Sequence, residues 1–132
     1  MHVSEERFEQ LVADALDGLP TDVAAALDGL PTDVAAALDN VAVVVEDWPS
    51  AEQLGARRGT LLGLYVGVPL TRRGPMSYAG VPPDRIVVFR GPLCSLAPDE
   101  TALVEQVRVT VLHELGHHFG LDDERLRELG WA

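Results

Sequence analysis

The chain has 132 residues, of which 47% are hydrophobic, and it carries a formal net charge of −11. This length suits one compact domain with a sizeable core, and the hydrophobic share excludes an intrinsically disordered chain. The acidic excess repels phosphate backbones and anionic lipid headgroups, so we expect neither nucleic acid nor a membrane as a partner. We therefore expect a single domain over residues 1–132, whose charge favours cationic partners.

The N-terminal region predicts helices, and it contains a repeat. Ser4 is a predicted N-cap for a first helix whose apolar residues share one stripe. The eleven residues 17–27 then recur without a mismatch at 28–38. Each copy has a Gly turn, a Pro at the helix entrance and a short Ala-rich run, which predicts two short helices. We interpret 17–38 as a tandem duplication within the N-terminal helical region, without a direct part in function.

Three apolar runs predict strands at 41–46, 61–66 and 86–89. The stretch 67–84 is rich in Gly and Pro and predicts a long loop, a feature that in a small domain often serves as a lid or binding wall. A long amphipathic helix follows, with Asp99 as its predicted N-cap, and then a short helix from Asp122 or Asp123 to Leu129. This order of elements is typical of a small α+β domain.

The most informative segment is His113-Glu114-Leu115-Gly116-His117, followed by Gly120 and Asp123. An α-helix places residues four apart on one face, so both histidines can direct a ring nitrogen at one ion. Glu114 lies about 100° round the helix, where it can reach a water without binding the metal. Gly120 can adopt a positive φ, end the helix and let Asp123 return to the same ion.

This donor set predicts a zinc hydrolase. Two imidazoles and one carboxylate leave a fourth coordination position open for water, although iron or manganese also accept such ligands. Zinc lowers the pKa of the water and polarises the scissile carbonyl, while Glu114 acts as the general base. We expect one zinc ion per chain at His113, His117 and Asp123.

Four nearby residues compete for these roles. Asp122 and Glu124 flank Asp123, and we expect them to cap the last helix or to remain solvated. His118 is turned about 100° from His117 on a helix, which favours a solvated or capping role over metal binding. Cys94 falls in a predicted loop, where a thiolate could approach the metal, but we interpret it as an incidental small side chain.

The chain resembles the small bacterial zincin-like metallopeptidases, the minimal zincins. The segments that carry the resemblance are 113–126, with the histidine motif, and 38–48, 62–70 and 84–92. The resemblance implies a small mixed sheet of three or four strands packed on the active-site helix, with zinc at the three residues named above. It also implies an edge strand that pairs with an extended peptide substrate, and Ile86 to Phe89 is the predicted edge.

Two alternatives belong to other functional classes. A non-catalytic metal-binding or interaction module would show a closed fourth coordination position, with Cys94 or His118 on the ion. A metal-dependent endoribonuclease is less favoured, because the related spacing in the enzymes of ribosomal RNA maturation has three histidines, and because RNA requires a positive groove. The peptidase hypothesis therefore implies a peptide or protein substrate, with no nucleic acid and no membrane; the sequence does not indicate an oligomeric state.

The location follows from cysteine usage and from the N-terminal composition. A single cysteine cannot form an internal disulfide, and residues 1–10 are polar and acidic, without the apolar core of a targeting signal. We expect a reducing, cytoplasmic location.

Overall fold

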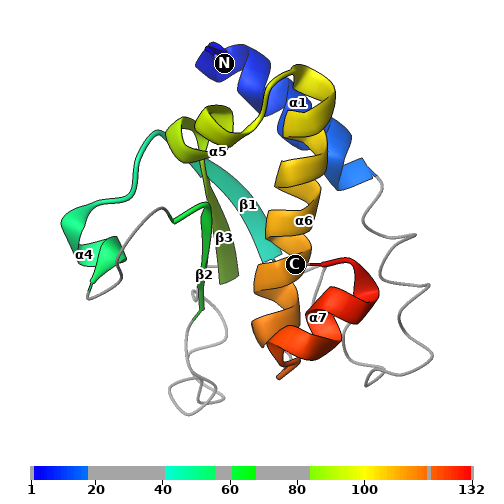
Figure 1. Cartoon of the computed structure of the whole chain (residues 1–132). Helices are drawn as coiled ribbons and strands as arrows, with labels where there is room; N and C mark the ends of the chain where they lie inside the picture. Colours follow the sequence, from blue (N-terminus) through cyan, green and yellow to red (C-terminus); the bar gives the residue numbers. More distant parts are fainter. Residues whose placement is uncertain (1, 18–40, 56–60, 68–83, 119, 132) are drawn as a thin grey trace.

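A computed structural model describes residues 2–17, 41–55, 61–67, 84–118 and 120–131. The helices and strands of these segments form a small α+β fold in which one long helix packs on a three-stranded mixed sheet (Figure 1). In chain order they are α1 (Glu5–Asp17), β1 (Val41–Glu46), α4 (Ala51–Leu54), β2 (Gly63–Val66), β3 (Asp84–Phe89), α5 (Arg90–Leu96), α6 (Glu100–His118) and α7 (Asp123–Leu129). Residues 18–38 of the duplicated segment and residues 68–83 of the predicted loop lie outside the described residues.

The sheet has the order β1-β3-β2, with β1 parallel to β3 and β2 antiparallel to it. The prediction that Ile86–Phe89 forms an edge was therefore wrong, because this run lies in the central strand. Its four residues are at most 1% exposed, so both faces of the strand are covered. A continuous run of apolar residues is typical of such a central strand. Among the described residues, β2 has no strand partner beyond β3, so β2 is the edge that lies nearest the predicted site.

The helix α6 carries the histidine motif of the predicted site and also contributes buried residues to the core. Asp99 caps it as predicted, since the Asp99 Oδ1 accepts a hydrogen bond of 2.8 Å from the Ala102 N–H. One hydrophobic cluster joins Ile86, Val88 and Leu93 to the buried aliphatic residues of α6, which are Leu103, Val107, Val111, Leu112 and Leu115. The helix packs against α1, β2 and β3. None of the described helices has the length and apolar character needed to cross a membrane.

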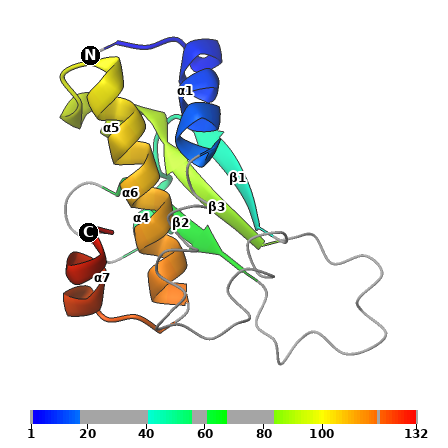
Figure 2. The ribbon, with the colours of Figure 1, turned by 90° about the vertical axis from the view of Figure 1, so that its right-hand side faces the viewer.

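The helix α1 covers the first half of α6 (Figure 2). It begins after Ser4, whose Oγ accepts from the Arg7 N–H, so the predicted N-cap is confirmed. Its predicted apolar stripe is buried except at Leu16, which is partly buried, and Phe8 is fully inaccessible. At the surface, the Arg7 guanidinium donates to both carboxylate oxygens of Glu100 at 3.0 and 2.8 Å, which joins α1 to the start of α6.

Two short helices were not predicted. The helix α4 begins with a capping box, because the Ser50 Oγ accepts from the Gln53 N–H and the Gln53 side chain accepts from the Ser50 N–H. The helix α5 follows β3 directly, where Gly91-Pro92 had indicated only the end of a strand. Trp48 packs over Gly91 and leaves no space for a side chain there.

Candidate metal centre and adjoining cavity

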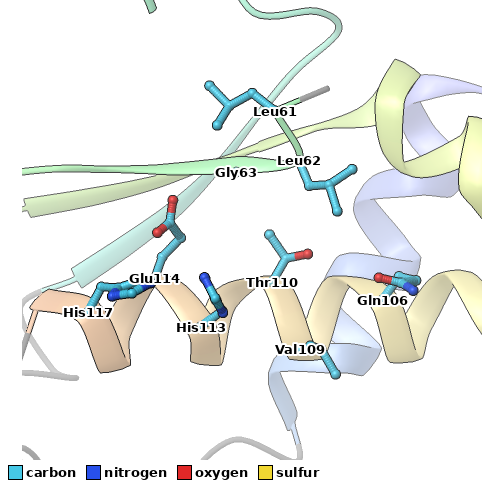
Figure 3. Close-up of a pocket in the computed structure, with 9 residues that line it drawn as sticks. All are labelled: Leu61, Leu62, Gly63, Gln106, Val109, Thr110, His113, Glu114 and His117. Atoms are coloured by element: carbon cyan, nitrogen blue, oxygen red, sulfur yellow. The ribbon is translucent and has the colours of Figure 1, made fainter. Parts of the chain in front are cut away.

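The two histidines of the motif lie one turn apart at the C-terminal end of α6. Their rings meet edge to face, with centroids 4.5 Å apart and planes at 83°. Both side chains reach the same cavity, and Figure 3 shows them side by side on the helix. The helical spacing of the sequence therefore produces the shared face that two ligands of one ion require.

After α6, the chain reverses direction at Gly120, where φ is 84°. The Gly120 N–H donates to the His117 carbonyl at 3.0 Å, and the Leu121 N–H donates to the Gly116 carbonyl at 2.9 Å. This pair of bonds is a Schellman motif, which satisfies the last carbonyls of a helix and requires the left-handed conformation that glycine adopts without strain. The predicted role of Gly120 in ending the helix agrees with this geometry.

The turn brings α7 back onto α6. Asp122 is the N-cap of α7, since its Oδ1 accepts a hydrogen bond of 2.8 Å from the Arg125 N–H. Asp123 is the next residue, and its Oδ1 lies 3.2 Å from Nε2 of His117. The neighbouring acids therefore have different roles: Asp122 holds the helix start, and Asp123 points at the histidines.

The donor atoms of His113, His117 and Asp123 all lie within 4.8 Å of one another. Zinc ligands at about 2.0–2.1 Å in a tetrahedral arrangement stand roughly 3.3 Å apart, close to the separation found between His117 and Asp123. Two imidazole nitrogens and one carboxylate oxygen are also the donor types of three-ligand catalytic zinc sites. By both separation and chemistry, the residues present fit a zinc ion.

A cavity of about 450 Å³ opens between α6 and the start of β2. Glu114 lines it together with both histidines, and its carboxylate points from α6 toward the strand that carries Gly63 (Figure 3). A Cβ on Gly63 would lie 2.6 Å from Cγ2 of Thr110, so a glycine here lets β2 run close against the helix. Away from the histidines the lining is mostly apolar, formed by Leu61, Leu62, Val109, Gln106 and Thr110.

The two residues that could have closed the coordination sphere lie elsewhere. The ring of His118 stacks on Tyr65 of β2, with centroids 4.0 Å apart and an angle of 12° between the planes. The Tyr65 hydroxyl donates to Asp84 at 2.7 Å. Cys94 is buried in α5 and lines a separate cavity with Val3 and Trp48. Within the described segments, the only cluster of potential metal ligands is the predicted trio of two histidines and one aspartate.

Two contributors to the site were not predicted. Gly116, an unassigned position of the motif, packs directly against Leu126 of α7, where any side chain would collide. The carbonyl oxygen of Trp131 lies 3.1 Å from Nδ1 of His113. A glycine between the two histidines of an amphipathic helix gives only a weak signal for close helix packing, and a main-chain carbonyl gives no signal at all.

Comparison with known proteins agrees with the fold. A sequence model of the zincin-like metallopeptidase family matches residues 38–131, which is more than half of the chain and includes β1 and both helices of the site. None of the curated protein sequences compared with this chain matches it. On the strength of the family match, this chain belongs to the zincin-like metallopeptidases.

Proposed function

We propose that this protein is a zinc-dependent metallopeptidase, with His113, His117 and Asp123 as metal ligands and Glu114 as the general base. One observation carries the proposal: Glu114 lines the same cavity as the two histidines, whose donor atoms cluster with that of Asp123. A metal site with a structural role alone does not require a carboxylate directed into an adjoining cavity. Membership of the family supports the same activity.

A bound zinc ion would supply Lewis acidity, which lowers the pKa of a water molecule to about 7 and polarises a peptide carbonyl. The carboxylate of Glu114 would accept a proton from the attacking water and later donate it to the leaving amide nitrogen. Glu114 is well placed for this because it follows His113 on the helix and lines the same cavity. His113, His117 and Asp123 hold their positions through α6 and the turn at Gly120.

The substrate we propose is a peptide in extended conformation. The edge strand β2 lies along α6, and its outer edge has no strand partner in the described part of the chain. A peptide paired with β2 would pass over Glu114 and place one side chain in the cavity, by the mode of recognition in which a ligand extends a sheet. Leu61, Leu62 and Val109 make that cavity suited to an apolar side chain next to the scissile bond.

The structural evidence favours a peptidase over the two alternatives. A non-catalytic module would be supported by a fourth protein ligand, yet His118 is stacked on Tyr65 and Cys94 lines another cavity. An endoribonuclease would need a positive surface, which is hard to reconcile with a net charge of −11. The single cysteine further fits a protein of the cytoplasm.

The test is cleavage of a peptide library by zinc-loaded wild-type protein and by Glu114→Gln. We expect the variant to retain zinc and to lose about 10²–10⁴-fold in kcat, the usual contribution of a general base. Glu105→Gln is the matched control, since Glu105 lies on the same helix and pairs with Arg108 outside the cavity. Equal cleavage by wild type and Glu114→Gln would remove the proposal, and full zinc occupancy without any cleavage would favour the non-catalytic module.

A further inference from the structure

The end of α7 returns the chain to the metal centre through a second Schellman motif. Gly130 adopts a φ of 77°, and its N–H donates to the Arg127 carbonyl. The Trp131 N–H donates to the Leu126 carbonyl at 2.8 Å. This turn places the residue after the glycine against the helix that precedes it. Trp131 therefore lies close to the C-terminal part of α6, next to His113.

The indole of Trp131 is held firmly in the core. Trp131 is 4% exposed and belongs to the main hydrophobic cluster, which also includes Leu126 and buried residues of α6. Trp48, by comparison, is 64% exposed. A large side chain fixed by burial also fixes the main chain that carries it, so the position of the Trp131 carbonyl is set by packing.

That carbonyl oxygen lies 3.1 Å from Nδ1 of His113. A carbonyl oxygen can only accept a hydrogen bond, so Nδ1 carries the proton and Nε2 keeps its lone pair. The neutral ring then has the tautomer that a metal ligand needs, and its rotation about the side-chain bonds is restricted. The bond joins a residue of α6 to the second residue after α7, so it also links the centre to the docking of α7.

We propose that Trp131 is a positioning residue for the metal centre: its buried indole holds its carbonyl where it fixes the tautomer and orientation of His113. The inference rests on the proposed role of His113 as a metal ligand. Trp131 touches neither substrate nor metal and acts only through the His113 ring. Partners of this kind that orient a ligand commonly change metal affinity by about 10–100-fold when they are lost.

Zinc affinity, measured by chelator competition well below each melting temperature, tests the proposal with three variants. We expect Trp131→Ala to raise the Kd for zinc about 10–100-fold, and Trp131→Phe to restore most of the affinity because a phenyl ring keeps the anchor. Leu11→Ala is the matched control, since Leu11 is 2% exposed on α1, and we expect it to lower the Tm without a change in zinc Kd. An unchanged zinc Kd in a folded Trp131→Ala, with only the Tm lowered, would show that Trp131 has a purely structural role.

A second measurement needs no variant. The ¹⁵N chemical shifts of the His113 ring in zinc-free wild-type protein report its tautomer, and we expect the proton on Nδ1. A proton on Nε2 would overturn the proposal even if Trp131→Ala fails to fold. A proton on Nε2 would not contradict the proposed activity, because a peptidase that depends on Glu114 could still orient His113 by other contacts.

Discussion

Leu126 of α7 occupies the space that a side chain on Gly116 of α6 would fill. This contact seats α7 against the last turns of α6, and Asp123 lies one turn before Leu126 on the same short helix. The distance between Asp123 and His117 therefore depends on an apolar contact that includes neither residue. The glycine between the two histidines therefore has a packing role. We expect this packing to be needed for the arrangement of the proposed metal ligands.

Gly116→Ala should force α7 away from α6. We expect a loss of about 1–3 kcal/mol in the free energy of unfolding of the zinc-free protein, the usual cost of overpacking. Leu126→Ala alone should cost about 2–5 kcal/mol, because Leu126 is fully buried. In the double variant the new methyl group enters the space left by the leucine. The loss in unfolding free energy, measured with urea, should therefore be smaller than the sum of the two single losses by about 0.5 kcal/mol or more. Strictly additive costs would show that the two residues do not compete for space.

Three adjacent acidic residues should respond differently to substitution. Asp123→Asn replaces the carboxylate that faces His117, and we expect zinc content to fall well below one ion per chain, with little change in the stability of the zinc-free protein. Asp122→Ala removes the N-cap of α7 and should cost about 0.5–2 kcal/mol in unfolding free energy. Glu124→Gln is the control and should change neither quantity. Zinc loss in Glu124→Gln with retention in Asp123→Asn would reassign the third ligand.

Local signals in the sequence predicted the elements well. The strand at 41–46 has the predicted bounds, and Ser4 and Asp99 cap the helices that they were expected to cap. Each of these features depends on residues close together in the chain, such as a hydroxyl or carboxylate that accepts from an N–H three residues ahead. The spacing of His113 and His117 belongs to the same class, because one helix determines it.

Features that depend on contacts between residues far apart in the chain were harder to predict from the sequence. The run 86–89 was assigned to an edge, yet it pairs with β1 and β2, which precede it by long intervals. Four consecutive apolar residues were nevertheless a sign of a strand covered on both faces. The contact of the Trp131 carbonyl with His113 had no such sign, because every residue carries a carbonyl and only the tertiary fold selects one.

Zinc should stabilise the folded protein, because a ligand that binds only the native state shifts the unfolding equilibrium. At a free zinc concentration of 100 times the Kd, the gain is about 2.7 kcal/mol, which calorimetry would detect as a higher Tm. His113→Ala should abolish this gain. His118→Ala is the matched control, since that ring stacks on Tyr65, and its zinc-dependent gain should persist. A normal gain in His113→Ala would contradict the ligand assignment.

The cavity should determine which peptides are cleaved. Val109 is half-buried in its wall, and Val109→Phe would fill part of the volume that we assign to an apolar substrate side chain. We expect kcat/KM for peptides with leucine or phenylalanine beside the scissile bond to fall by about tenfold or more, with a smaller effect on alanine at that position. Zinc content should stay unchanged. An equal loss for large and small side chains would show that the cavity does not select the substrate.

Cys94 should behave as an inert structural thiol. Burial raises the pKa of the Cys94 thiol, which is 6% exposed in α5 and lines a cavity distinct from that of the metal centre. Because thiolate is the reactive form, labelling by a disulfide reagent at neutral pH should be slow in native protein and fast in urea.

The raised pKa of the Cys94 thiol also makes stability depend on pH. Its contribution to stability is fully present below the pKa of a thiol in the unfolded chain, about 8.5, and is lost as the pH rises through the higher pKa of the folded state. Cys94→Ala should therefore weaken the decline in stability at alkaline pH and leave zinc content unchanged. Zinc loss in this variant would instead place the thiol on the metal and favour a closed, non-catalytic site.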